Sequence, residues 1–304
     1  MQVLLEGVLA GFELRSSALV DRAFAWAKVR LAAIGRAPER LEAVAEACVE
    51  VLAAELGERH RPRAAALMRD VTVFLRHVSA EPPVDPAPEM AEGGAGARLL
   101  QAMLAGDRIA ARALLTELDD PSRALDERLE PAIRALGRLW QVGRLTAGKE
   151  HVASRVATDL VQDLVRRTTV LATAPRVAFV RSPDDEHSFG QVCLQVHCRC
   201  FGVELVPVPP ADDAAELVAM LTAAAPAAVA IGCSTPRHLL AARGMLKAMR
   251  SAPELARLPV LLGGGVFVDV PQLAVQLGAS ATAASGRQAA QLLAGSLCGA
   301  RAAT

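Results

Sequence analysis

The sequence has few aromatic residues, no net charge and no long apolar run. Phe, Trp and Tyr make up 3% of the 304 residues and tyrosine is absent, whereas 52% of the residues are hydrophobic. An interior with so few rings favours Ala- and Leu-rich helices or α/β layers over a β-sandwich. The 33 basic and 33 acidic residues cancel, so the chain has no bulk attraction for nucleic acid, although a local basic patch stays open.

The chain also lacks membrane and export signals. No window holds ~18 uninterrupted apolar residues, so no membrane-spanning helix is expected. The first residues, MQVLLEGVLAGFELRSS, have no basic lead, and acidic residues interrupt their apolar stretch. Six cysteines without regular spacing are typical of reduced thiols. We therefore predict a cytoplasmic protein that does not associate with a membrane.

The first part of the chain is predicted to be all-α. Residues 1–80 form a helical domain of unknown role, followed by a linker at 81–97 with four prolines and three glycines. Residues 98–173 show helical spacing again, with breaks that give about four helices, the size of a four-helix bundle. The N-terminal helices are expected at 16–34, 38–56 and 61–78.

The spacing of apolar residues changes in the last part of the chain, residues 174–304, which is predicted to be α/β. Four short apolar runs, RVAFV, VELVPV, AAVAIGC and PVLLGG, alternate with helix-length segments, and a weak fifth run occurs near SATAA. Unbroken apolar strands that alternate with helices favour a parallel sheet covered on both faces. We expect a flavodoxin-like, Rossmann-like domain with strand order 2-1-3-4-5.

Three polar or Gly-rich segments follow strands of this sheet. They are DDEHSFG after the first strand, GCSTP after the third and GGGV after the fourth. Ligands of such sheets bind at the carboxyl ends of the strands, so the three segments should line one crevice. The chain has neither G-x-G-x-x-G nor G-x-x-x-x-G-K-[ST] here, and Cys233-Ser234 stands where a phospho-acceptor domain needs Asp. Glycines at this edge permit close approach of a large planar or extended ligand.

A histidine on the first loop is the candidate metal ligand. Asp185 precedes His187 by two residues and can accept a hydrogen bond from one ring nitrogen. Such a bond fixes the tautomer and makes the other nitrogen a better metal donor. In the alternative interpretation, Asp185 and Glu186 cap a helix that begins near Ser188, and His187 is an exposed loop residue.

The pattern Asp185-x-His187-x-x-Gly190, with Ser234 and Gly263-Gly264 after later strands, resembles the cobalamin-binding domain. Methionine synthase, corrinoid carrier proteins, carbon-skeleton mutases and cobalamin-dependent light sensors share this domain. The resemblance implies that His187 displaces the dimethylbenzimidazole base and binds cobalt from below, supported by Asp185. It also implies that Ser234 contacts the displaced base and that the nucleotide tail runs beside Gly263 and Gly264.

The upstream helical segment carries a second pattern, Trp140-x9-Glu150-His151. It resembles the signature of CarH-type light-sensing regulators, whose four-helix bundle covers the upper face of adenosylcobalamin. The resemblance implies that Trp140 packs against the adenosyl group and that Glu150 contacts its polar atoms. Adenosylcobalamin is the expected cofactor and methylcobalamin the alternative. An indole can shield an organometallic bond from water, and a carboxylate can accept hydrogen bonds from ribose or adenine.

Three features depart from these families. Pro236 stands two residues after Ser234, where the cobalamin-binding family usually has Leu or Thr. Gln141 replaces the histidine that ligates cobalt after illumination in CarH-type sensors, and His151 is the candidate substitute. Residues 1–80 do not resemble a winged-helix DNA-binding domain. We therefore expect no direct DNA binding, with output through a protein partner or a change in homo-oligomer state.

Three functions remain open. The first is an adenosylcobalamin-dependent photoreceptor, a signalling protein that regulates transcription through a partner. The second is a corrinoid carrier that shuttles methyl groups between methyltransferases, against which the Trp-x9-Glu-His pattern counts because carriers need an open upper face. The third is a sensor of cobalamin itself, without light. In the first and third the protein is not an enzyme, and in the second it is a component of one.

Other candidates are given structural roles. Cys193, His197 and Cys200 share one helix face beside Cys198, which is the spacing of a metal face, but thiols also commonly fill cores, and core packing is favoured here. Trp26 is expected in the core. Three histidines without a sequence partner are expected at the surface, namely His60, His77 and His238.

Overall fold

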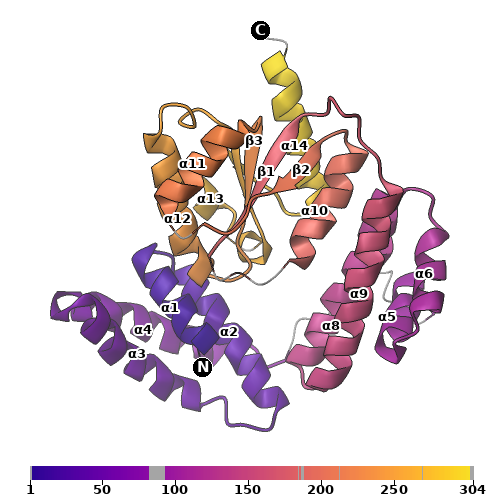
Figure 1. Cartoon of the computed structure of the whole chain (residues 1–304). Coiled ribbons are helices and arrows are strands. Elements are labelled where there is room, and N and C mark those ends of the chain that lie inside the picture. The colour runs from indigo at the N-terminus through magenta and orange to yellow at the C-terminus, as the bar shows by residue number, and fades with distance from the viewer. Residues whose placement is uncertain are drawn as a thin grey trace. The chain divides into compact units, whose positions relative to one another are not determined.

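The computed structural model of the chain describes residues 2–81, 93–183, 185, 188–211, 213–268 and 270–301. The chain divides into two compact units (Figure 1). The first unit contains Met1–Pro86 and Ala135–Glu150, and the second contains Ala87–Arg134 and His151–Thr304. Most of the predicted linker lies outside the described residues, and the four predicted domain ranges stay a prediction. Among the described residues, no helix combines the length and apolarity needed to cross a membrane.

The described N-terminal residues of the first unit are helical, as predicted. An apolar cluster holds these helices together, with Phe12, Phe24, Leu41 and Met68 among its buried side chains. Tight packing of such side chains stabilises a helical unit by removing apolar surface from water. The helices are α1 (Gln2–Glu13), α2 (Ser17–Ala33), α3 (Arg40–Leu56), η1 (Glu58–His60) and α4 (Arg61–His77).

The next helices follow the predicted breaks. Gly106 ends α5 in a left-handed conformation, and the Asp107 side chain caps α6 by accepting a hydrogen bond from Ala110 N at 2.9 Å. Asp120 caps the following helix, which contains a π-helical turn just before Pro131. A proline ring crowds the carbonyl four residues earlier, which explains why the regular ladder is interrupted here. The elements are α5 (Ala95–Ala105), α6 (Arg108–Thr116), α7 (Pro121–Ala124), η3 (Leu125–Leu129), α8 (Glu130–Gln141) and α9 (Ala147–Arg167).

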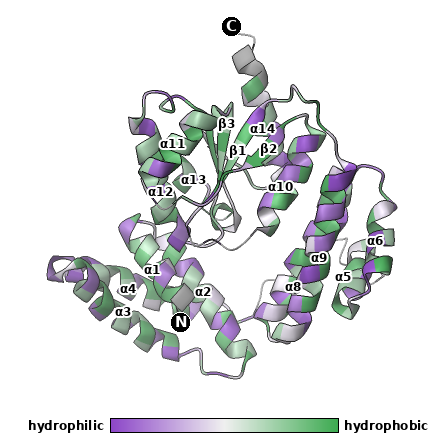
Figure 2. Ribbon diagram, in the orientation of Figure 1, coloured by the Kyte–Doolittle hydropathy of each residue, from purple (hydrophilic) through white to green (hydrophobic). Residues whose placement is uncertain are grey.

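The second unit contains the predicted parallel sheet, with order β2-β1-β3-β4-β5. Val177 and Phe179 of β1 belong to a core cluster with α10 and α14, and the alternate residues face the other side. Figure 1 shows α11 and α12 on that other side of the sheet. Figure 2 shows that the strands between the two helix layers are largely hydrophobic. The strands are β1 (Arg176–Arg181), β2 (Glu204–Pro207), β3 (Ala228–Gly232), β4 (Val260–Gly263) and β5 (Ala281–Thr282). The remaining helices are α10 (Phe189–Cys200), α11 (Ala214–Ala224), α12 (Arg237–Ser251), η4 (Gly265–Phe267), α13 (Gln272–Gln276) and α14 (Gly286–Arg301).

Candidate functional site

A cavity of about 410 Å³ lies at the carboxyl ends of β1, β3 and β4, where ligands of this fold are expected. Its size is within the ~300–1,000 Å³ typical of small-molecule sites. The structure brings together the predicted residues Asp185, Ser234, Gly263 and Gly264 on its wall. Most of the remaining wall is apolar and comes from the strands, α10 and α14, including Phe179, Cys193, Leu194, Ala230, Ile231, Leu261 and Ala289.

The Asp185 carboxylate is buried and held from the neighbouring strand. Its Oδ2 atom accepts hydrogen bonds from the Ser234 backbone N at 3.1 Å and from the Ser234 hydroxyl at 2.8 Å. Two charge-assisted bonds to one oxygen restrict the carboxylate to a single orientation. Asp185 therefore joins the loop after β1 to the loop after β3. The roles of Asp185 and Ser234 toward a cofactor stay predictions.

His238 contacts the same carboxylate, so its predicted surface position is wrong. The side chain is only 2% exposed, and Nδ1 lies 3.3 Å from Asp185 Oδ2. The Thr235 backbone N lies 3.3 Å from Nδ1, and Arg237 Nε lies 3.1 Å from Nε2. Sequence reasoning missed this contact because only the sheet brings together Asp185, on the loop after β1, and His238, at the start of α12.

The two glycines at the end of β4, Gly263 and Gly264, differ in whether the backbone could accept another residue. Gly264 has φ +125° and ψ 166°, a region that only glycine occupies readily. A Cβ atom there would overlap the Cys233 carbonyl oxygen and lie 2.8 Å from the carbonyl carbon. At Gly263 the nearest atom to a Cβ would be Leu261 Cδ2 at 3.6 Å, an ordinary contact. The backbone conformation therefore requires glycine at 264. At 263 the backbone does not require glycine, and the missing side chain leaves the cavity wall bare.

The cavity offers neutral thiols rather than thiolates. Burial raises the pKa of the Cys233 thiol to about 12. The pKa of Cys193 is raised well above its usual range by burial first and by the charge of Glu130 second. Both thiols stay protonated at neutral pH and do not supply an anionic ligand or nucleophile. The predicted metal ligand, His187, lies outside the described residues with Glu186, and its role stays a prediction.

Trp140 lies in the first unit, in contact with the N-terminal helices. The Arg30 guanidinium sits 4.7 Å from the Trp140 ring centroid, and its NH1 donates to the Trp140 and Gln141 carbonyls at 2.7 and 3.2 Å. The rings of Trp26 and Trp140 lie 6.3 Å apart. Trp26 is 38% exposed, so its predicted core position is wrong. It faces another indole at the helix surface rather than the apolar core.

Glu150 and His151 occupy the first turn of α9. An acidic residue at this position complements the helix dipole. Glu150 belongs to the first unit, whereas the cavity lies in the second. His151 is exposed and begins the next segment of the second unit. Contacts of Trp140, Glu150 and His151 with a cofactor stay predictions.

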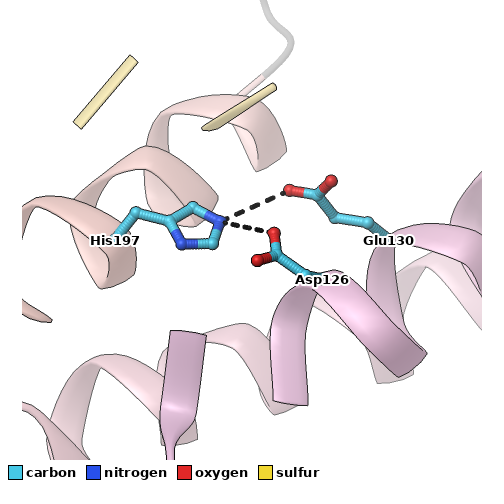
Figure 3. A group of neighbouring side chains, drawn as sticks. All are labelled: Asp126, Glu130 and His197. Atoms are coloured by element: carbon cyan, nitrogen blue, oxygen red, sulfur yellow. Dashed lines mark ion pairs between the residues drawn. The ribbon is translucent and has the colours of Figure 1, made fainter. Parts of the chain in front are cut away.

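A cluster that sequence reasoning missed is formed by residues of η3, α8 and α10 (Figure 3). His197 is fully buried, and its Nε2 lies 3.3 Å from Asp126 Oδ1 and 3.7 Å from Glu130 Oε1. Among the described residues, the group around His197 that could hold a metal contains Asp126 and Glu130 and no cysteine. Cys193 is buried, as expected for core packing, and Cys200 is exposed. The available signal was the i, i+4 spacing of Asp126 and Glu130, which puts both carboxylates on one helix face.

The comparisons with known proteins agree with this fold. Residues 96–163 match a family model described as "B12 binding domain". The monomethylamine corrinoid protein of Methanosarcina barkeri aligns with 65% of this chain and 95% of its own, at 13% identity and a TM-score of 0.53. At that identity the match shows a shared fold.

Two further solved structures match with lower TM-scores. A cobalamin-binding protein from Desulfitobacterium hafniense aligns with 65% of this chain and 96% of its own, at 16% identity and a TM-score of 0.36. The methanol:cobalamin methyltransferase complex of Methanosarcina barkeri aligns with 74% of this chain and 89% of its own, at 14% identity and a TM-score of 0.38. None of the curated proteins matches the chain significantly.

Proposed function

We propose that this chain binds cobalamin, with the nucleotide tail in the cavity and His187 as the lower cobalt ligand. The observation that carries the proposal is the fixed carboxylate of Asp185 beside an apolar cavity and a bare glycine edge. A benzimidazole base needs apolar walls, and a metal-binding imidazole needs an oriented acceptor for its second nitrogen. The B12 binding domain match covers residues 96–163, in the helices before the sheet, and supports cobalamin binding by the chain without bearing on His187 or the cavity.

The residues of the cavity would bind and orient the cofactor. Asp185 would accept a hydrogen bond from the His187 ring, and Ser234 keeps Asp185 in place by donating a hydrogen bond to it. Phe179 and Leu194 provide part of the apolar wall for the displaced base. Gly263 allows the tail to approach the backbone of β4. Bound adenosylcobalamin would supply a cobalt–carbon bond that light can break.

We propose further that the protein is a light sensor that uses adenosylcobalamin. In this proposal Trp140 and Glu150 contact the adenosyl group, with His151 available as an upper ligand after photolysis. Support comes from the attachment of Trp140 to α2 through Arg30 and Trp26. Loss of a group held by Trp140 would supply the differential interaction that a switch requires. The signal would then reach the N-terminal helices and, through them, a protein partner or a homo-oligomer interface.

The alternative is a corrinoid methyl carrier that is not itself a catalyst. The fold shared with the monomethylamine corrinoid protein favours this candidate. A methyl carrier would transfer its group between partner enzymes and would have no use for a light response. A cytoplasmic location and the absence of direct DNA binding are part of both proposals.

The test is reconstitution with adenosylcobalamin and methylcobalamin in the dark, with affinity and absorption spectrum measured for each. We expect His187→Ala to bind at least tenfold more weakly and to lose the spectrum of a histidine-ligated cobalt, as expected when a metal ligand or its support is lost. His77→Ala, at an exposed histidine, is the matched control. Equal affinity and an unchanged spectrum for His187→Ala would refute cobalamin binding through this residue.

Illumination separates the sensor from the carrier. The sensor should prefer the adenosyl form and change its elution volume after green light, whereas the carrier should pass a methyl group to a thiol acceptor. We expect no bis-imidazole spectrum that depends on position 141, because Gln141 has no imidazole. Such a spectrum, if Gln141→Ala abolished it, would contradict this expectation.

A further inference from the structure

Three potential ligand atoms converge at the cluster of Asp126, Glu130 and His197 (Figure 3). All three atoms lie within 4.8 Å of one another, and His197 Nε2 is 3.3 Å from Asp126 Oδ1 and 3.7 Å from Glu130 Oε1. Tetrahedral zinc with bonds of ~2.0–2.1 Å needs donor atoms ~3.3–3.4 Å apart. The two separations measured from His197 Nε2 are therefore close to those of a tetrahedral metal site.

The buried imidazole is directed into this space. His197 is 0% exposed, and within the part of the chain that the structure describes its Nε2 has no hydrogen-bond partner of acceptable geometry. The other nitrogen, Nδ1, lies 2.7 Å from the hydroxyl of Ser122, which is itself buried. If Nδ1 donates its proton to Ser122, the lone pair of Nε2 faces two carboxylate oxygens. That arrangement is repulsive unless a cation lies between them.

The surrounding residues hold the two carboxylates in place. Arg287 Nε pairs with Asp126 Oδ2, and Arg134 NH1 lies 3.4 Å from Glu130 Oε2. The oxygens that face His197 are the other two, Oδ1 and Oε1. Metal-binding carboxylates and histidines are commonly oriented in this way by a second set of partners.

A glycine at the start of α14 leaves room beside the cluster. A Cβ on Gly286 would lie 2.8 Å from His197 Cδ2, 3.3 Å from His197 Nε2 and 3.6 Å from Glu130 Oε1. The α14 backbone therefore passes close to the three ligand atoms, and only glycine leaves that space clear. The cluster thus lies where three helical segments meet: the π-helical turn with α8, α10 and α14.

We propose that Asp126, Glu130 and His197 bind a divalent transition-metal ion of the zinc class. One imidazole and two carboxylates are a donor set that suits Zn²⁺, and a water molecule would complete the tetrahedron. Mg²⁺ and Ca²⁺ prefer all-oxygen ligands in larger number, so they should bind weakly. The ion would join α8 to α10 and α14. Because Glu130 and Gly286 also line the cavity at the carboxyl ends of the strands, the ion would lie at the border of that cavity.

The competing explanation is a proton in place of the metal. A proton on His197 Nε2 could also lie between the imidazole and the carboxylates. Ser122 would then accept from Nδ1 of a doubly protonated ring or donate to Nδ1 of a neutral one. The two explanations differ in whether purified protein takes up zinc. They also differ in the effect of zinc on thermal unfolding, because only a ligand that binds the folded state raises Tm as its concentration rises.

The experiment uses the full chain, tag-free, expressed without corrinoid and stripped with a chelator. Equilibrium dialysis against Zn²⁺, with metal measured by mass spectrometry, should give one ion per chain and little Mg²⁺. Asp126→Asn and His197→Gln should weaken zinc binding by at least ~100-fold, and Ser122→Ala by ~10–100-fold. Glu127→Gln, an exposed carboxylate on the same turn, and His77→Gln should bind like wild type.

Zinc uptake by wild type at no more than adventitious levels, with no rise in Tm, would overturn the proposal and favour the shared proton. Undiminished zinc binding by a folded His197→Gln protein would also overturn it. If that variant does not fold, three other measurements test the proposal: the zinc stoichiometry of wild type, the rise of the wild-type Tm with zinc, and zinc binding by the milder Ser122→Ala variant. Because no corrinoid is present, failure here leaves the cobalamin proposal unaffected, and failure of cobalamin binding leaves this one unaffected.

Discussion

The two adjacent glycines after β4 should respond very differently to the same small substitution. Gly264→Ala places a methyl group against the Cys233 carbonyl in a backbone conformation that alanine rarely adopts. Gly263→Ala adds the same methyl group 3.6 Å from Leu261 Cδ2, which is ordinary van der Waals contact. Comparison of the two variants therefore separates the cost of the backbone conformation at position 264 from the effect of an added methyl group.

The expected magnitude follows from two contributions. A non-glycine residue in this region of φ and ψ costs about 1–3 kcal/mol. Relief of the overlap must move the backbone that carries the hydrogen bond from Cys233 N to Gly263 O, 2.8 Å long, and its loss costs about 0.5–1.5 kcal/mol. Gly264→Ala should therefore lower the free energy of unfolding by about 2–4 kcal/mol, a large share of the ~5–15 kcal/mol typical of folded proteins.

Urea denaturation followed by far-UV circular dichroism measures this difference, without any cofactor. Gly263→Ala should stay within about 1 kcal/mol of wild type, because nothing near its Cβ must move. If cobalamin binds as proposed, that folded variant should bind it more weakly, since the methyl group protrudes from the cavity wall. A Gly264→Ala protein as stable as wild type would refute the backbone argument.

Two further predictions concern Arg30 and Cys233. Arg30→Met removes a cation–π contact and two hydrogen bonds to carbonyls, so it should lower the free energy of unfolding by about 2–3 kcal/mol. Denaturation followed by fluorescence checks this, because Trp26 and Trp140 are the two tryptophans of the chain; an unshifted midpoint would contradict it. Burial raises the pKa of Cys233 from 9.0 to about 12, so the unfolded chain loses this proton first and stability should fall from pH 9 toward pH 12. Cys233→Ala should flatten that decline in urea titrations at pH 8, 9 and 10, and an unchanged slope would argue against it.

Local patterns were sufficient to predict the sheet. The short apolar runs gave all five strands, and the parallel order followed from the helices between them. The rule that ligands bind at carboxyl ends then placed Asp185, Ser234 and the two glycines on one cavity wall. Each of these inferences needs only the period of a segment and the direction of its strand.

The errors concern side chains whose partners come from other elements. His238 of α12 contacts Asp185 on the loop after β1, and Trp26 of α2 contacts Trp140 of α8. His197 of α10 lies against Asp126 of η3 and Glu130 of α8. Sequence spacing can place Asp126 and Glu130 on one helix face, but it does not show which element that face meets, because tertiary packing decides this. The π-helical turn adds to the difficulty, since it rotates the residues after it relative to a regular helix.

The outermost strands of the sheet limit how copies of this chain can associate. β5 has two residues and β2 has four, the last of which is Pro207, without a backbone N–H. Such short edge strands expose few free backbone N–H and C=O groups with which a strand of another chain could pair. Association of copies of this chain is therefore expected to use side chains on the outer faces of the helices rather than backbone hydrogen bonds between sheets.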